Sequence, residues 1–249
     1  MNLEEQQRYH AVGADYFWLA GKRQLALRVL AQHSHGDAPS GSPRRVLDAG
    51  CGPGHDFQDL KPHGMLYGLD PSQAALQFCQ QKYGPQVHLV CASGERLPFR
   101  HGSFNLIIML DVLEHIEADE AALAECRQIL KPGGRMLITV PAFQRLWGSH
   151  DDLYGHKRRY TADELRQKVL RAGLTIDHIT YVEWLFTLPL WLTRSIKRRL
   201  PARYRGDDFV RVPRWLNVWL TRLITAEAAW VNTHTMPWGA SIVCVAHAT

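Results

Sequence analysis

The chain has 249 residues, of which 46% are hydrophobic and 21% are charged, and its formal net charge is +5. This composition excludes an intrinsically disordered protein and supplies enough apolar side chains for one large domain or two small ones. No uncharged apolar stretch reaches the length of a membrane span, and the polar N-terminal residues are unlike a secretory signal. The five cysteines are scattered, which predicts reduced thiols in a cytosolic protein without disulfides or a zinc site.

The positive charge is concentrated in one segment. Eight of the 29 basic residues, but two of the 24 acidic ones, lie between residues 194 and 214. Six of the eight tryptophans lie between residues 184 and 238, so aromatic residues surround this basic segment. Such a combination is typical of a surface that contacts an anionic partner, either a membrane or a nucleic acid.

Strand and helix patterns alternate along most of the chain. A helical pattern covers residues 3–31, and a linker rich in Gly, Ser and Pro follows at residues 35–43. Strands are predicted at residues 45–48, 65–70, 87–90, 104–110, 135–140, 175–182 and 241–246, and helices at residues 72–83, 118–130 and 161–172. This order predicts an α/β fold of the Rossmann-like kind, a doubly wound, mostly parallel seven-stranded sheet with helices on both faces.

We expect a single domain over residues 1–249 with four parts. Residues 1–40 form an N-terminal helical cap, and residues 41–182 form the ligand-binding core. Residues 183–238 are a helical insertion before the last strand, rich in Trp and Arg, and residues 239–249 form that strand. The insertion is expected to be an addition that the sheet does not need.

A glycine-rich turn follows the first predicted strand. Gly50, Gly52 and Gly54 allow a tight turn and a close approach of the backbone to a ligand. The second predicted strand ends in Asp70, whose carboxylate can there accept hydrogen bonds from both hydroxyls of a ribose. The G-x-G-x-G spacing differs from the G-x-G-x-x-G of dinucleotide sites, and Asp48 would repel a pyrophosphate but attract a sulfonium or an amino group. The pattern therefore favours a cationic nucleoside ligand over NAD.

Five motifs together resemble those of the class I S-adenosylmethionine-dependent methyltransferases, particularly their bacterial small-molecule branch. They are V-L-D-A-G-C-G-P-G at 46–54, G-L-D-P-S at 68–72, E-R-L-P-F at 95–99, L-D-V-L-E-H at 110–115 and L-K-P-G-G at 130–134. The resemblance implies S-adenosylmethionine as the cofactor. It also implies that the methionine part lies among Asp48, Gly50 and Gly52, and that Asp70 binds the ribose.

The resemblance further implies where the adenine lies. Leu69 and Pro71 would flank the ring, and the backbone of Leu110 would lie near the methionine end. Ser93 and Gly94 would contact the adenine amino group. The family often has an Asp that accepts a hydrogen bond from this group, and this chain has Ser93 in its place.

Methyl transfer from a sulfonium requires alignment, and a base as well when the acceptor is a hydroxyl that must lose a proton. His115 follows the fourth predicted strand and is a candidate base, the alternative being a helix cap. Asp111, Glu114 and His115 also match the spacing of a divalent-metal site in ubiquinone-pathway O-methyltransferases, which this segment resembles. Because the same string is common in metal-free relatives, we expect no metal.

A second cluster of polar residues follows the fifth predicted strand. His150, His156 and Arg158 are its candidate catalytic residues, and the pattern leaves open which histidine is the base. The connection is longer than an ordinary one, which favours a functional loop. Histidine, acidic and arginine side chains together suit an anionic acceptor with a histidine base. The alternative is a solvated loop whose arginines pair with its own acids.

Aromatic residues are grouped near the N-terminus and in the predicted insertion. Tyr9, Tyr16, Phe17 and Trp18 either cap the cofactor cleft or pack within a helix. Residues 184–192 are apolar but too short to cross a bilayer, so residues 184–214 are expected to contact a membrane peripherally, with residues 215–220 as a second such face. A lid and a homodimer interface are the alternatives. A nucleic-acid substrate is disfavoured for two reasons. The D-P-P-Y-type motif of amino-methylating enzymes is missing after the fourth predicted strand, and no Pro-Cys pair supplies a thiolate that could attack cytosine.

These observations predict a cytoplasmic S-adenosylmethionine-dependent methyltransferase, peripheral at the inner face of the membrane if the insertion binds lipid. The acceptor would be a hydroxyl or carboxylate oxygen of a small or lipid-linked molecule. The alternatives are an N- or C-methyltransferase and a catalytically silent protein that binds the cofactor or docks on a membrane.

Overall fold

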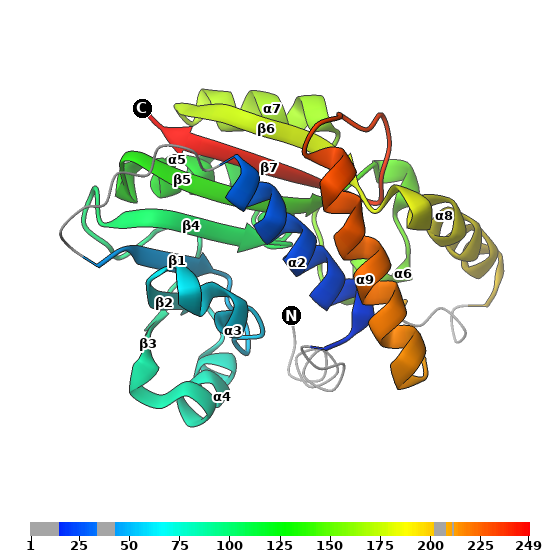
Figure 1. Cartoon of the computed structure of the whole chain (residues 1–249), viewed down its shortest axis with the longest axis horizontal. Helices are drawn as coiled ribbons and strands as arrows, with labels where there is room; N and C mark the ends of the chain where they lie inside the picture. Colours follow the sequence, from blue (N-terminus) through cyan, green and yellow to red (C-terminus); the bar gives the residue numbers. More distant parts are fainter. Residues whose placement is uncertain (1–14, 34–42, 202–207, 211) are drawn as a thin grey trace.

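The computed structural model describes residues 15–33, 43–201, 208–210 and 212–249 (Figure 1). Its one named sheet has seven strands in the order β3-β2-β1-β4-β5-β7-β6, and β7 runs antiparallel to its neighbours. The strands are β1 (Arg45–Ala49), β2 (Met65–Asp70), β3 (Val87–Cys91), β4 (Phe104–Leu110), β5 (Leu130–Pro141), β6 (Leu174–Val182) and β7 (Ser241–Ala248). The predicted mostly parallel seven-stranded sheet is confirmed.

Helices cover both faces of the sheet (Figure 1). On one face lie α5 (Asp119–Ile129) and α7 (Ala162–Arg171). On the other face lie α2 (Phe17–Gln32), α3 (Phe57–Leu60), α4 (Gln73–Tyr83) and α9 (Arg214–Val231). Two further helices, α6 (Ser149–Leu153) and α8 (Trp184–Arg199), lie beyond the carboxyl ends of the parallel strands.

The central strand β4 shows why the sheet is buried on both faces. Its continuous apolar run sends Ile107 and Met109 into the core under α5 and α7, and Leu106 and Ile108 into the core under α2 and α9. Alternate side chains of a strand point to opposite faces, so a run without polar interruptions is what two covered faces require. The predicted N-cap of α4 is also present, since the hydroxyl of Ser72 accepts a hydrogen bond from the Ala75 N–H.

Strand β5 is longer than its predicted span. Its first residue is Leu130, which pairs with Phe104 of β4, so the strand begins five residues before the predicted start at residue 135. The register shifts between Phe104 and Leu106, which marks an irregularity where the strand accommodates two glycines. The strand starts early because Leu130 pairs with β4, and the local sequence pattern does not reveal this pairing.

Helix α9 covers one face of the sheet. The expectation that the sheet does not need residues 183–238 is therefore wrong for this helix. Ile224, Ala228 and Val231 are buried in the same core as Val243 and Val245 of β7. Its close contact with α2 depends on Gly21, where an added Cβ would lie 2.8 Å from the Cβ of Ile224. Residues 183–238 therefore supply one helix that the sheet needs, while the four-part division of the chain remains a prediction.

Candidate active site

A cavity of about 670 Å³ opens at the carboxyl ends of the parallel strands. It lies where the strand order reverses between β1 and β4, the place at which open α/β sheets bind ligands. Its walls come from the turns after β1, β2 and β4, from α2, from the segment after β5 and from α8. Seven of the predicted cofactor-binding residues line it, namely Gly50, Gly52, Asp70, Pro71, Ser93, Gly94 and Leu110.

The glycine-rich turn folds back against β2. The N–H groups of Gly50 and Cys51 both donate hydrogen bonds to the Leu69 carbonyl, at 2.7 and 3.0 Å. Gly52 has a φ of +49° and lines the cavity, and no atom lies within 4 Å of an added Cβ at this position. The turn therefore leaves open space beside its backbone, as a cradle for a ligand would.

Asp70 is held by the backbone around it. Its Oδ2 accepts a hydrogen bond from the Gly52 N–H at 2.9 Å, and its Oδ1 accepts one from the Ser72 N–H at 2.8 Å. Each carboxylate oxygen has a second lone pair, so Asp70 can also accept hydrogen bonds from the two hydroxyls of a ribose. This geometry fits the nucleoside part of S-adenosylmethionine.

Asp48 lies behind the turn and does not line the cavity. Its side chain is buried, and among the described residues its Oδ2 has no hydrogen-bond partner. Burial, and after it the neighbouring Asp56, raises the pKa of Asp48 well above its usual value. A buried carboxyl oxygen without a partner is costly unless another group satisfies it. Because Asp48 does not line the cavity, its contact with the methionine part of the cofactor stays a prediction.

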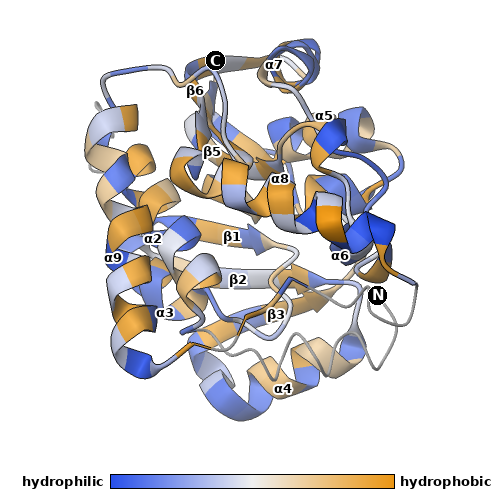
Figure 2. Cartoon of the chain, turned by 90° about the vertical axis from the view of Figure 1, so that its right-hand side faces the viewer, coloured by the Kyte–Doolittle hydropathy of each residue, from blue (hydrophilic) through white to orange (hydrophobic). Residues whose placement is uncertain are grey.

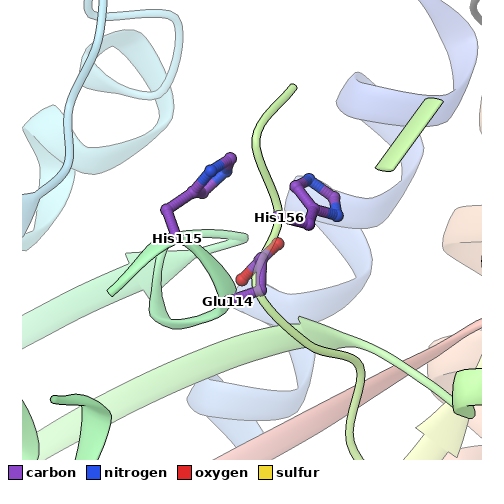
Figure 3. Close-up of side chains that lie close together, drawn as sticks. All are labelled: Glu114, His115 and His156. Atoms are coloured by element: carbon purple, nitrogen blue, oxygen red, sulfur yellow. The ribbon is translucent and has the colours of Figure 1, made fainter. Parts of the chain in front are cut away.

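Three histidines, His115, His150 and His156, also line the cavity. The rings of His115 and His156 have centroids 4.7 Å apart, and the ring of His150 lies 6.1 Å from that of His156. Figure 3 shows His115, His156 and Glu114 around one space. Their possible ligand atoms lie within 4.8 Å of one another, which is close enough to share a metal ion. The metal-free site expected from the sequence stays a prediction.

Asp151 organises this part of the cavity from its buried position on α6. Its Oδ1 lies 2.8 Å from His156 Nδ1 and accepts a hydrogen bond from Arg159, while its Oδ2 accepts one from the Gly148 N–H. Burial opposes ionisation, but the hydrogen bond with His156 and the charges of Arg159 and Arg194 outweigh it and lower the pKa of Asp151. Because an ionised carboxylate only accepts, His156 carries its proton on Nδ1 and presents Nε2 as a proton acceptor.

The other two histidines are neutral near pH 7. Burial lowers the pKa of His150 to about 3 and that of His115 to about 4. Both rings can therefore exchange hydrogen bonds with an acceptor without bringing a positive charge to it.

Arg158 lies away from the cavity, and two other arginines contribute to its wall. Arg158 donates a hydrogen bond to the Glu117 carbonyl and pairs with Asp119 at 3.1 Å. Arg159 and Arg194 line the cavity, and both bind Asp151. Sequence reasoning missed Arg159, and it placed Arg194 in the surface basic segment although this side chain is 4% exposed.

The N-terminal helix closes one side of the cavity. Tyr16 and Trp18 line it as expected, whereas Phe17 packs into the core and Tyr9 lies outside the described residues. Lys22 of α2 also lines it, with its Nζ 2.7 Å from Asp111 Oδ2 and 3.9 Å from Glu183 Oε2.

Backbone strain is concentrated at the same edge of the sheet. Asp111, Phe143 and Glu183 are non-glycine residues with positive φ, and they follow β4, β5 and β6. Strained conformations of this kind often persist at functional sites, where the surrounding structure holds them. Asp111 and Glu183 both face Lys22, so the strain coincides with a buried group of charges.

Residues 47–138 match a family of methyltransferase domains. A malonyl-[acyl-carrier protein] O-methyltransferase of Legionella pneumophila is 30% identical over 184 residues, which cover 66% of this chain and 64% of that protein. A phthiotriol/phenolphthiotriol dimycocerosates methyltransferase of Mycobacterium ulcerans is 28% identical over 176 residues, 67% and 65% of the two chains. The chain carries a class I S-adenosylmethionine-dependent methyltransferase domain. S-adenosylmethionine is its cofactor.

Solved structures share the fold of this methyltransferase domain. A phosphoethanolamine N-methyltransferase of Haemonchus contortus in complex with S-adenosyl-L-methionine has a TM-score of 0.57 at 15% identity, over 90% of this chain and 52% of that one. The [4+2]-cyclase SpnF also has a TM-score of 0.57, at 17% identity, over 91% and 81%. The fold therefore does not define the reaction. The chain spans between 26% and 65% of the length of the curated relatives that it matches. The activity and the methyl acceptor of the whole protein are therefore proposals.

Gly52→Ala tests whether the methyltransferase domain binds its cofactor beside the glycine-rich turn. The added methyl group would enter the open space at Gly52, so we expect at least about a tenfold loss of affinity for S-adenosylhomocysteine. Gly133→Ala is the matched control, because Gly133 also has a positive φ and open space but does not line the cavity. Calorimetry would measure both, and equal affinities would contradict this placement of the cofactor.

Proposed function

We propose that the protein transfers the methyl group of S-adenosylmethionine to a hydroxyl oxygen of a small or lipid-linked acceptor. The observation that carries this proposal is the hydrogen bond between the buried, ionised Asp151 and His156, which lines the same cavity as the glycine-rich turn. A histidine held in this way is a proton acceptor, and a hydroxyl acceptor must lose a proton, whereas a carboxylate acceptor need not.

The bound cofactor supplies a methyl group on a positively charged sulfur, which makes the carbon electrophilic. His156 Nε2 takes the proton of the acceptor hydroxyl as the acceptor oxygen forms its bond to the methyl carbon. The carbon–sulfur bond of the bound cofactor would break as this bond forms, and its electron pair would stay on the sulfur. Asp151 then stabilises the positive charge on His156, and Arg159 and Arg194 hold Asp151 in place.

The charges around the cavity favour a hydroxyl over a carboxylate acceptor. Arg159 pairs with Asp151, and Arg194 pairs with both Asp151 and Asp208. Lys22 is likewise paired with Asp111. These cations are already neutralised within the protein, which leaves little attraction for a negatively charged acceptor.

Glu114 is a candidate for binding a second polar group of the acceptor. It is fully buried and lines the cavity, and neither side-chain oxygen accepts a hydrogen bond from another described residue. Burial, and after it the charge of Asp111, raises the pKa of Glu114 well above its usual value. A polar group of the acceptor would satisfy these oxygens and so fix its orientation.

The test uses S-adenosylmethionine with a labelled methyl group and two acceptor pools, a lipid extract and a soluble metabolite extract. We expect label to enter an acceptor in one pool, and the pool identifies a lipid-linked or a small acceptor. Label found on nitrogen or carbon would contradict the proposal. Bound cofactor without label in either pool would favour the catalytically silent alternative.

The class of acceptor is supported by the relatives. One is named for a malonyl group on an acyl-carrier protein, and another for phthiotriol dimycocerosates. The first of these acceptors is carried by a protein, and the second is a lipid. We propose, in line with the second name, an acceptor that is attached to a lipid, and a cytoplasmic protein that meets this acceptor at the inner face of the membrane.

A further inference from the structure

Helix α8 has one face in the cavity and an opposite face in solvent. Leu190 and Arg194 line the cavity, and the buried guanidinium of Arg194 binds Asp151 and Asp208. Large apolar side chains point outward from the same helix, with exposed fractions of 42% at Leu185, 69% at Leu188, 44% at Trp191, 52% at Leu192 and 51% at Ile196. In Figure 2 α8 runs across the front of the molecule with its hydrophobic residues in orange.

The first half of α9 adds a second exposed apolar face. Trp215, Val218 and Trp219 have exposed fractions of 72%, 42% and 56%. In Figure 1 α8 lies at the right and α9 lies between it and the centre, and in Figure 2 α9 stands at the left edge of the view that α8 crosses. We call these eight side chains of α8 and α9 the outer apolar surface. An exposed apolar surface of this extent on a folded domain marks a contact site.

The charges of the two helices indicate what this surface contacts. Arg198 and Arg199 at the end of α8, and Arg214 and Arg222 on α9, are exposed. Neither helix has an exposed carboxylate, because α8 contains no acidic residue and Glu227 of α9 is 7% exposed. Exposed Leu and Trp side chains with arginines and no acids are complementary to a bilayer that contains anionic lipids.

We propose that the outer apolar surface docks on an anionic lipid bilayer and so delivers a lipid-linked acceptor to the cavity; this inference rests on the proposed function. The contact is peripheral, since none of the helices in the described part of the chain is long and apolar enough to cross a membrane. A helix is about 10 Å across, so a cavity on the inner side of α8 lies within reach of a lipid headgroup. The acceptor hydroxyl is then part of a headgroup whose acyl chains remain in the bilayer.

Co-sedimentation with vesicles tests the docking. The vesicles contain phosphatidylcholine alone or phosphatidylcholine mixed with phosphatidylglycerol. We expect salt-sensitive binding to the anionic vesicles, and a loss of at least about tenfold in Leu188→Ser/Leu192→Ser. Leu170→Ser on α7 is the control, because Leu170 is 52% exposed but lies outside the outer apolar surface. Its binding is expected to equal that of the wild type.

Three results would overturn the docking proposal. The first is no binding to anionic vesicles, and the second is binding that Leu188→Ser/Leu192→Ser leaves unchanged. The third is a dimer in solution that this double variant dissociates, because the outer apolar surface would then be a homodimer interface. Affinity for S-adenosylhomocysteine is measured in parallel and is expected to be the same in all variants. Vesicle binding without any methyl transfer would leave the docking intact and reject the proposed function.

Discussion

Replacing Asp70 by alanine is expected to lower the affinity for S-adenosylhomocysteine by at least about a hundredfold. Two hydrogen bonds from ribose hydroxyls to an ionised carboxylate would be lost, and each contributes roughly 1.5–3 kcal/mol. The same change removes the acceptors of the Gly52 and Ser72 N–H groups, so the turn that cradles the cofactor would also loosen. Isothermal titration calorimetry measures the change directly.

Asp70→Asn is the matched control for this prediction. It keeps the shape of the side chain and one oxygen acceptor but loses the charge, so we expect an affinity between those of wild type and Asp70→Ala. Melting temperatures without ligand establish that both variants fold. An affinity of Asp70→Ala within about threefold of wild type, less than 1 kcal/mol, would refute the assignment of Asp70 to the ribose.

His156→Ala is expected to lower kcat by about 10²- to 10⁴-fold, the usual contribution of a general base. Affinity for S-adenosylhomocysteine should not change, because we expect the nucleoside to be held by Asp70 and the turn at Gly52 and not by His156. Imidazole added to the solution should restore part of the rate if His156 acts as a base. A merely structural role would not give this rescue.

His150→Ala is the control for the base assignment. Its ring lies 6.1 Å from that of His156, and no hydrogen bond joins it to Asp151 among the described contacts. We therefore expect a smaller fall in kcat than in His156→Ala. A rate that falls with His150→Ala but not with His156→Ala would reverse the two roles.

The cofactor-binding residues of the cavity could be predicted from the sequence because their signals are local. The spacing of Gly50 and Gly52 and the position of Asp70 at the end of β2 fix their relation to the sheet edge once the strands are known. The continuous apolar run of β4 likewise predicts a strand covered on both faces. Asp48 is the exception, since its placement behind the turn depends on three-dimensional packing.

The proposed acceptor-binding residues could be predicted only in part. Neighbouring side chains of an extended segment point to opposite sides, and the sequence does not tell which of Arg158 and Arg159 faces the cavity. Arg194 is distant in the sequence and reaches Asp151 only because α8 lies over the cavity. The packing of α9 on α2 through Gly21 is equally non-local, so no pattern within residues 183–238 reveals it.

Methyl transfer to a hydroxyl is tested most directly by the alkali stability of the labelled product. A methyl ether made from a hydroxyl survives mild alkaline hydrolysis, whereas a methyl ester made from a carboxylate releases its label as methanol. We expect the label to stay on the acceptor after alkali, and we expect His156→Ala to abolish most of the labelling. Release of the label as volatile methanol would contradict a hydroxyl acceptor and remove the need for His156 as a base.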